Sequence, residues 1–367
     1  MSTTWIPFMS LAPGGERAAV RDAIDRVIER GWFVLGPEVD AFESEFAAAM
    51  GASHAVGVGS GTDAIALTLR ALGIGAGDEV ITTPLSAAYT ALAIMMAGAR
   101  PVFADIDPER LTIDPAHVQR AIGPRTRAIL PVHLYGQAAD MGALEVIAAR
   151  HHLALVEDCC QAHLATAAGR PVGTVGVAGA FSFYPTKNLG ALGDGGAVVT
   201  NDRALADRIR RLRNGGQTDR YHHQEAGVNS RLDEIQAAVL RARLPHLAGW
   251  TERRRQLAAS YRSALAGAVD VPPECDNGHV YHLFVVRAPS RDRLRAALTE
   301  RGIETLIHYP VPIPRQPALA GIGPGDFPVA ERACNEVLSL PLHPGLSDQD
   351  ARHITDSLLK GYDECAH

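Results

Sequence analysis

The hydrophobic positions between about residues 54 and 200 fall into short runs that alternate with longer amphipathic stretches. Short apolar runs separated by helical patterns are typical of strands buried on both faces of a mostly parallel sheet. The runs predict strands at His54–Gly59, Glu79–Thr83, Pro101–Ala104, Ala128–Val132, Leu153–Glu157, Ala180–Phe183 and Ala197–Thr200. The stretches between and after them predict helices at Thr62–Gly73, Tyr89–Gly98, Asp140–His151 and Asp202–Arg213.

The pattern changes after residue 247, which divides the chain into two predicted domains. A helix is predicted at Ser230–Leu244, with Ser230 and Asp233 placed as a capping box. The later pattern predicts helices at Glu252–Leu265 and Arg291–Arg301 on either side of a single clear strand at His282–Arg287. It also predicts two irregular connections rich in Pro and Gly, Thr305–Pro317 and Gly321–Pro328. We therefore expect a large α/β domain with an N-terminal arm at 1–247 and a small α+β domain at 248–367.

Composition and charge exclude several classes of protein. The chain has 367 residues, a net charge of -6 and a pI of about 6.2, so neither nucleic acid nor an anionic membrane is an expected partner. No apolar run approaches the roughly 18 residues of a membrane helix, and Met1–Pro13 lacks the pattern of a signal peptide. The five cysteines are scattered and odd in number, which favours neither a disulfide framework nor a metal site. We expect a cytoplasmic protein.

Lysine is rare in this chain. Only Lys187 and Lys360 occur among 35 basic residues, and Lys187 lies mid-chain in a Gly-rich segment. Arginine can replace a lysine that only solvates the surface, but not one that must lose a proton and attack a carbonyl. The position of Lys187 therefore favours a chemical role over an exposed loop.

Two further segments have residues that suit a phosphorylated cofactor. Gly57–Asp63 leads from a predicted strand into a helix, where free N–H groups with Ser60 and Thr62 would cradle a phosphate. Taken alone, this segment is better explained by an ordinary capped turn from a strand into a helix. Leu155–Asp158 ends a strand with two carboxylates, at the edge of the sheet where α/β proteins bind ligands. A phosphate cradle, an acid for a ring nitrogen and the amine of Lys187 are the three contacts that pyridoxal 5'-phosphate (PLP) requires.

In order along the chain, these segments resemble the DegT/DnrJ/EryC1/StrS family of sugar aminotransferases, which are PLP enzymes of fold type I. The likeness covers nearly the whole sequence. It rests on Gly31–Glu38, Ser60–Ala64, Val132–Gln137, Glu157–His163, Phe181–Gly190, Tyr221–His223, Asn229–Glu234, His308–Pro312 and Leu340–Pro344.

The resemblance implies an aspartate-aminotransferase-like fold and a role for each matching residue. Lys187 matches the Schiff-base lysine, Asp158 the partner of the pyridinium nitrogen, and Gln161 a residue that contacts the ring. The remaining matches are the phosphate pocket (Ser60, Gly61, Thr62, Ser182), the substrate contacts (His163, His308, Tyr309) and Asn229, which would reach the cofactor of a neighbouring subunit. Such sharing implies an obligate homodimer.

Three positions depart from the family pattern. The aromatic residue that usually covers the pyridine ring is replaced by Ala87, and Tyr89, two places later, is the candidate to cover it instead. The small residue after His163, often Gly, is Leu164. A basic residue that commonly follows the His-Tyr-Pro loop is replaced by Pro314, with Arg315 beside it.

The function implied is PLP-dependent transfer of an amino group from L-glutamate to a nucleotide-linked keto-deoxysugar, with pyridoxamine 5'-phosphate as the intermediate form. A cyclitol aminotransferase is an alternative that the sequence separates only weakly. A sugar dehydratase of this family would carry His in place of Lys187, and a non-catalytic PLP-binding regulator would not need the intact set of Lys187, Asp158 and Gln161. The sequence leaves open the nucleotide, the keto position and the stereochemistry.

Overall fold

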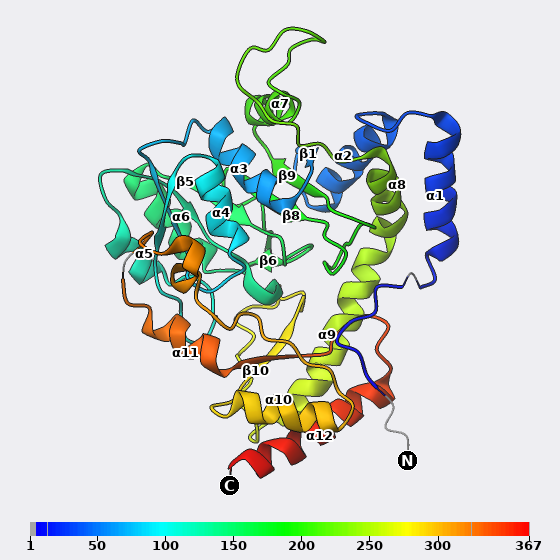
Figure 1. Ribbon diagram of the computed structural model, residues 1–367, viewed down its shortest axis with the longest axis vertical. Helices are drawn as coiled ribbons and strands as arrows, with labels where there is room; N and C mark the ends of the chain where they lie inside the picture. Colours follow the sequence, from blue (N-terminus) through cyan, green and yellow to red (C-terminus); the bar gives the residue numbers. More distant parts are fainter. Residues whose placement is uncertain (1–4, 13, 324, 367) are drawn as a thin grey trace.

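A seven-stranded sheet forms the centre of the computed structural model, which describes residues 5–12, 14–323 and 325–366 (Figure 1). Its strand order is β1-β9-β8-β5-β4-β2-β3, and β9 runs opposite to both neighbours while the other adjacent pairs are parallel. The strands are β1 (His54–Val58), β2 (Glu79–Thr82), β3 (Arg100–Phe103), β4 (Thr126–Leu130), β5 (Ala154–Asp158), β8 (Ala178–Ser182) and β9 (Gly196–Thr200). The predicted α/β fold with a mostly parallel sheet is confirmed.

Helices cover both faces of this sheet because successive strand residues point to opposite sides. In β4, Ile129 joins one core while its neighbours Ala128 and Leu130 join the other. The first core packs on α2 (Pro37–Ala49), α5 (Pro115–Ala121) and α6 (Met141–His151). The second packs on α3 (Gly61–Ala71), α4 (Tyr89–Met96) and α7 (Arg203–Leu212).

The C-terminal part has its own core around a two-stranded antiparallel ribbon of β10 (Phe284–Arg287) and β11 (Val337–Leu340). The expectation of a single strand here was wrong, because β11 follows the preceding helix directly and no turn residue marks its start. The helices of this part are α9 (Leu247–Leu265), α10 (Arg291–Glu300), α11 (Pro328–Glu336) and α12 (Asp348–Ala366). Ile6 of the N-terminal arm also packs into this core. We keep a division near residue 247, where α9 begins, as a proposal.

The start of α8 (Glu234–Arg243) differs from its prediction. Ser230 lies outside the helix, where its hydroxyl donates to Asp63 Oδ2 at 2.9 Å and accepts from Gly59 N at 2.9 Å. Asp233 occupies the N-cap position without a side-chain cap bond, so the expected capping box is absent from the described helix. Ser230 ties α8 to the start of α3 instead.

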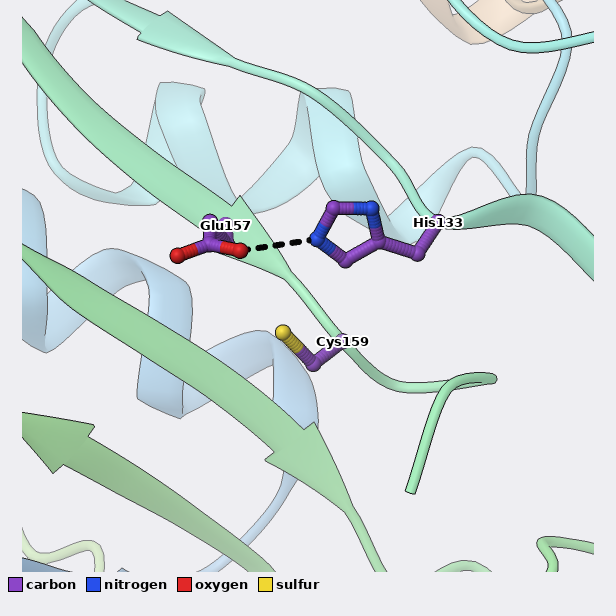
Figure 2. A group of neighbouring side chains, drawn as sticks. All are labelled: His133, Glu157 and Cys159. Atoms are coloured by element: carbon purple, nitrogen blue, oxygen red, sulfur yellow. Dashed lines mark hydrogen bonds and ion pairs between the residues drawn. The ribbon is translucent and has the colours of Figure 1, made fainter. Parts of the chain in front are cut away.

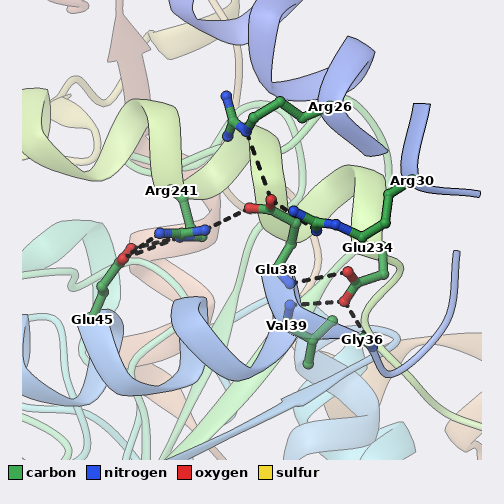
Figure 3. A network of polar contacts seen from close by, with 8 residues as sticks. All are labelled: Arg26, Arg30, Gly36, Glu38, Val39, Glu45, Glu234 and Arg241. Carbon is green, nitrogen blue, oxygen red and sulfur yellow. Dashed lines mark hydrogen bonds and ion pairs between the residues drawn. The ribbon is translucent and has the colours of Figure 1, made fainter. Parts of the chain in front are cut away.

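Glu234 fixes the adjacent helix α2 (Figure 3). Its carboxylate accepts from the backbone N–H groups of Gly36 (2.9 Å), Glu38 (3.0 Å) and Val39 (2.8 Å), which are free donors at a helix N-terminus. The Glu38 side chain in turn meets Arg241 at 2.6 Å and Arg30, in α1 (Arg17–Arg30), at 3.3 Å. These contacts lock α1, α2 and α8 together beside the sheet.

The remaining elements are short: the strands β6 (Thr166–Ala167) and β7 (Arg170–Pro171), and the 3₁₀ turns η1 (Leu134–Gly136), η2 (Leu244–His246), η3 (Ile313–Arg315) and η4 (Pro317–Leu319). Among the described helices, none combines the length and apolar character needed to cross a membrane.

Candidate active site

Lys187 and Asp158 lie at the carboxyl-terminal edge of the sheet, after β8 and at the end of β5. Burial lowers the pKa of the Lys187 amine, and the nearby Cys160 and Asp158 partly oppose this shift. A lysine in this environment loses its proton more readily than one on the surface. The amine can therefore act as a nucleophile and as a proton carrier.

Asp158 is 4% exposed and both of its carboxylate oxygens have a donor. Thr90 Oγ1, in the first turn of α4, donates to Oδ2 at 2.8 Å, and the backbone N–H of Cys160 donates to Oδ1 at 3.1 Å. Two donors from different elements fix the plane of the carboxylate, which gives it one direction in which to meet a cationic ring nitrogen.

Gln161 is held in one orientation by its two neighbours. Its Oε1 accepts from the backbone N–H of Tyr135 at 2.7 Å, and its Nε2 donates to the hydroxyl of Tyr309 at 3.1 Å. The Tyr135 hydroxyl donates to the carbonyl oxygen of His308. Burial raises the pKa of Tyr309 to about 12, so its hydroxyl stays protonated. These bonds join Gln161 to the loop predicted to contact substrate.

The predicted phosphate cradle lies at the N-terminus of α3, next to this group. Ser60 is the N-cap residue, and its hydroxyl accepts from Asp63 N at 3.1 Å. A Cβ atom at Gly61 would lie 2.7 Å from Cys160 Sγ and 2.8 Å from Ser182 Cβ, so only glycine fits there. Thr62 is half-buried in the first turn. The cradle therefore lies against Ser182 and the side chain of Cys160, two residues after Asp158.

His308 closes the small-domain side of the site. Its Nδ1 lies 2.9 Å from Ser339 Oγ of β11, and its ring lies 5.7 Å from that of Phe8 in the N-terminal arm. Burial and the positive charge of Lys187 lower the pKa of His308 to about 4, which leaves a neutral imidazole at physiological pH.

Three of the predicted residues have no described hydrogen bond to Lys187, Asp158 or Gln161, although His163 is near enough to Lys187 for its charge to lower the His163 pKa. Tyr89 is 65% exposed at the start of α4, and Asn229 is exposed where its backbone pairs with that of Asn214. His163 is completely buried against Phe46, Phe181 and Phe183, and burial lowers its pKa to about 3. Their roles toward cofactor and substrate stay predictions, and the burial of His163 argues for packing.

The departures from the family pattern also have a structural setting. Ala87 is half-buried just before α4, and its place in the family pattern opposite a cofactor ring stays a prediction. Leu164 adopts a left-handed φ of 65°, which explains why glycine suits this position. Arg315 pairs with Glu331 at 2.8 Å.

Sequence reasoning missed Thr90, Cys160 and Tyr135 as parts of this cluster. Thr90 had a usable signal, because it is a small polar residue in the otherwise apolar α4 next to a strand end. Tyr135 lies in the Val132–Gln137 segment of the family resemblance, but its contact with the His308 loop joins residues far apart in the chain, so no local pattern indicated that contact.

A second buried group, His133, Glu157 and Cys159, has the composition of a metal site (Figure 2). The side chains of His133 and Glu157 already have hydrogen-bond partners. His133 Nδ1 accepts from Ala139 N at 3.1 Å, which leaves Nε2 to donate to Glu157 at 3.0 Å. Glu157 also accepts three backbone N–H bonds, from Gly173, Val175 and Gly176. Burial raises the pKa of the Cys159 thiol and disfavours the thiolate that metals bind. The group serves to hold the 173–176 turn.

Comparison with known proteins gives a consistent result. The sequence profile of the DegT/DnrJ/EryC1/StrS aminotransferase family matches residues 16–359. The chain is 51% identical, over 97% of its own length and 96% of the relative's, to the dTDP-3-amino-3,4,6-trideoxy-alpha-D-glucose transaminase of Streptomyces venezuelae.

Solved structures agree with this. The crystal structure of DesV from S. venezuelae in complex with a ketimine intermediate is 50% identical, with a TM-score of 0.96 over 98% of this chain and 99% of that one. A Bacillus subtilis structure, NtdA with the bound cofactor PMP, is 30% identical, with a TM-score of 0.92 over 99% and 86% of the two chains.

Proposed function

This chain belongs to the DegT/DnrJ/EryC1/StrS aminotransferase family and is a nucleotide-sugar aminotransferase, and from this premise we propose that it uses PLP to move an amino group from L-glutamate to C3 of a dTDP-linked keto-deoxyhexose. The observation that carries the cofactor proposal is the convergence of the Lys187 amine, the fixed Asp158 carboxylate and the α3 N-terminus on one site.

These residues suit PLP in shape as well as in chemistry. The α3 N-terminus and the Ser182 side chain would bind the phosphate, since a Cβ at Gly61 would fill the space between them. Asp158 would pair with the ring nitrogen, and Lys187 would attach covalently to the aldehyde carbon. When bound, PLP acts as an electron sink for the carbanion that forms as a substrate loses its proton.

The protein's own residues then perform three tasks. Asp158 would hold a protonated ring nitrogen, with its direction set by Thr90 and the Cys160 backbone. Lys187 would carry a proton to and from the substrate carbon, because its lowered pKa lets the amine both accept and return that proton. The side chains of Gln161 and Tyr309, which are hydrogen-bonded to each other, would present N–H and O–H donors to the sugar that accepts the amine.

The choice of acceptor follows from the similar S. venezuelae transaminase, whose name specifies a dTDP-linked deoxysugar with its amine at C3. At 51% identity over nearly the full chain, a shared acceptor class is the simplest proposal. The presence of lysine, not histidine, at position 187 supports amino transfer over dehydration.

We also retain the predicted homodimer. Asn229 and the neighbouring Tyr221 are exposed, as a residue must be if it reaches the site of a second subunit. Trp32, Phe33 and Tyr184 are each about half exposed, which suits side chains that a second subunit would cover. Light scattering coupled to size exclusion tests this, and a monomer that is fully active would contradict it.

A half-reaction screen tests the acceptor. The protein is loaded with pyridoxamine 5'-phosphate and offered dTDP-linked 3-keto and 4-keto sugars, a UDP-linked 3-keto sugar and scyllo-inosose. We expect the dTDP-linked 3-keto sugar to restore the visible band of bound PLP fastest. A faster response to scyllo-inosose would identify a cyclitol aminotransferase, and no response to any of them would contradict the proposal.

A further inference from the structure

The amine of Lys187 forms no hydrogen bond with the residues that the structure describes, so its position depends on the loop that carries it. The backbone N–H of Lys187 donates to Tyr184 O at 2.8 Å, and the loop closes where Ala191 N donates to Phe183 O at 2.7 Å. A lysine stem is long and flexible, so a loosely held loop would let the amine occupy many places. The contacts that hold this loop therefore decide where the amine meets its target.

Asn188, the residue after Lys187, holds the loop with both ends of its side-chain amide. Its Nδ2 donates to Val280 O at 3.2 Å, and its Oδ1 accepts from His282 Nδ1 at 3.1 Å. Asn188 is 6% exposed and His282 is 4% exposed. A buried amide whose donor and acceptor are both used has one preferred orientation. The loop is thus fixed to segment 280–283, which lies more than ninety residues further along the chain.

Segment 280–283 also pairs with the η1 turn, which holds Gln161. Val280 N donates to Gly136 O at 3.0 Å, and Leu283 N donates to Tyr135 O at 3.3 Å. The backbone N–H of Tyr135 in turn donates to Gln161 Oε1 at 2.7 Å. One short segment therefore contacts the lysine loop through Asn188 and the Gln161 side chain through the η1 turn, so it sets the two sides of the site relative to each other.

Arg254 of α9 restrains the same segment from the small domain. It is 4% exposed, and its Nη1 donates to the carbonyl oxygens of Tyr281 (3.1 Å), His282 (3.3 Å) and Leu342 (2.8 Å). Hydrogen bonds from an ionised donor are roughly twice as strong as those between neutral groups. A buried cation that bonds three carbonyl oxygens makes this backbone a rigid support for Asn188.

His282 lies close enough to Lys187 for the charge of the lysine to act on it. Burial, and after it the positive charge of Lys187, lowers the pKa of His282 well below its usual value, so the imidazole is neutral at physiological pH. A neutral imidazole has one N–H, and the amide oxygen of Asn188 can only accept, so this N–H is on Nδ1. His282 can therefore fix Asn188 without adding a positive charge beside the amine.

We infer that Asn188 and His282 are positioning residues for Lys187, whose hydrogen bond to each other fixes the place from which the amine attacks a carbonyl carbon. The inference rests on the proposed function, in which Lys187 attaches to the aldehyde of PLP. Displacing a reacting group by about 1 Å can slow a reaction by about 10²-fold. Asn188 and His282 act through the loop, and neither is assigned a contact with the cofactor.

The first test separates attachment of the cofactor from its binding. Full-length Asn188→Ala, freed of cofactor, is mixed with PLP, and the bond to Lys187 is trapped with borohydride at successive times and measured by mass. We expect the rate of attachment to fall at least about tenfold. Pyridoxamine 5'-phosphate has no aldehyde, so its affinity should stay within about twofold of the wild-type value. An unchanged rate, or equal losses in both measurements, would overturn the inference.

Asn201→Ala is the matched control for this variant. Asn201 Oδ1 accepts from Ser53 N at 2.8 Å, at the opposite edge of the sheet from Lys187. Its loss removes a side-chain amide of the same size and should change neither the attachment rate nor the affinity. Label found at Lys360, the only other lysine, measures non-specific reaction in every sample. Attachment slowed as much by Asn201→Ala as by Asn188→Ala would count against the inference.

The second test changes the partner of Asn188. The amide of His282→Asn can place its N–H close to the position of Nδ1, whereas the longer His282→Gln places its amide near Nε2 and leaves Asn188 Oδ1 without this donor. We expect the attachment rate to stay within about threefold of wild type in the first and to fall about tenfold in the second. Urea denaturation checks that both fold, and the pair decides the question if Asn188→Ala does not. Equal rates in these two variants would overturn the inference.

The same measurements separate this inference from the proposed function. If the wild-type protein converts glutamate and the variants attach PLP at the wild-type rate, the inference fails while the function stands. If the variants behave as expected but the wild-type protein converts no amino donor, the proposed transamination fails and the positioning role stands. A wild-type protein that forms no reducible bond between PLP and Lys187 would contradict the cofactor proposal, and the inference with it.

Discussion

Thr90 Oγ1 donates a 2.8 Å hydrogen bond to Asp158 Oδ2, and this bond ties the first turn of α4 to the end of β5. Thr90 touches neither the proposed phosphate cradle nor Lys187 in the described contacts, so it acts through Asp158. It is a positioning residue for the carboxylate that meets the ring nitrogen.

Thr90→Val keeps the shape of the side chain and removes the donor. We expect the affinity for PLP to fall about tenfold, because a hydrogen bond to a charged group contributes about 1.5–3 kcal/mol. Equilibrium dialysis of PLP measures this directly, with Thr90→Ser as the control that keeps a hydroxyl. Equal PLP affinity in Thr90→Val and the wild type would show that Cys160 N alone is enough to position Asp158.

The fold could be predicted from the sequence wherever one short pattern determines one element. Each predicted strand of the central sheet is present to within a few residues, since a buried parallel strand must be an apolar run. β11 was missed because its short run is continuous with α11, and Ser230 was misplaced because its hydroxyl bonds to Asp63 and not to its own helix.

The candidate site was predictable only in its local parts. Lys187 and Asp158 lie in short motifs that predict their chemical roles, and the structure brings the two residues close together. The bonds from Thr90 to Asp158 and from Tyr135 to the His308 loop join distant segments, so no local pattern contains them.

Lys187→Arg should abolish covalent attachment of PLP, because a guanidinium keeps its proton and cannot attack an aldehyde. We expect turnover to fall by about 10³-fold or more, as the proton carrier is lost with the nucleophile. Intact mass after borohydride reduction measures the attachment. Lys360→Arg, which alters the only other lysine in the sequence, on exposed surface of α12, is the control and should retain the label. A labelled Lys187→Arg protein would contradict the assignment.

Tyr309→Phe and Gln161→Ala should not have additive effects, because the two side chains share one hydrogen bond of 3.1 Å. We expect a coupling of about 1 kcal/mol in kcat/KM for the sugar acceptor, which is typical of a neutral hydrogen bond in a double-mutant cycle. Tyr362→Phe, on α12, serves as the control in place of Tyr309→Phe and should show no coupling with Gln161→Ala. If the effects of Tyr309→Phe and Gln161→Ala on kcat/KM are strictly additive, the hydrogen bond between the two side chains does not contribute to the reaction with the sugar acceptor.

Glu234→Gln should destabilise the fold more than a typical surface change. The carboxylate is completely buried and accepts three backbone N–H bonds at the start of α2, whereas an amide offers one acceptor oxygen. We expect the free energy of unfolding to fall by about 2–3 kcal/mol, measured by urea denaturation. Asp233→Asn, at the neighbouring exposed position without a cap bond, should change it by less than about 0.5 kcal/mol. Similar losses in both variants would contradict this role for Glu234.

His163 should make the fold sensitive to acid. Its pKa is about 3 in the folded protein and 6.5 in an exposed histidine, so between these values the unfolded chain holds a proton that the folded chain excludes. Stability is therefore lost as pH falls through this window, by up to about 1.4 kcal/mol per pH unit for one proton. His163→Leu removes the titrating imidazole from its packing against Phe46, Phe181 and Phe183, and the drop in urea midpoint between pH 7 and pH 5 should become smaller.

The control is His353→Gln, which changes an exposed histidine of α12 and should leave the drop in urea midpoint unchanged. His279 and His308, with pKa values lowered to about 3 and about 4, will maintain part of the acid sensitivity, so the effect of His163→Leu is a reduced slope and not a flat one. A slope as steep as in the wild type would show that His163 is protonated in the folded protein, and would favour a role for it in binding an anionic substrate.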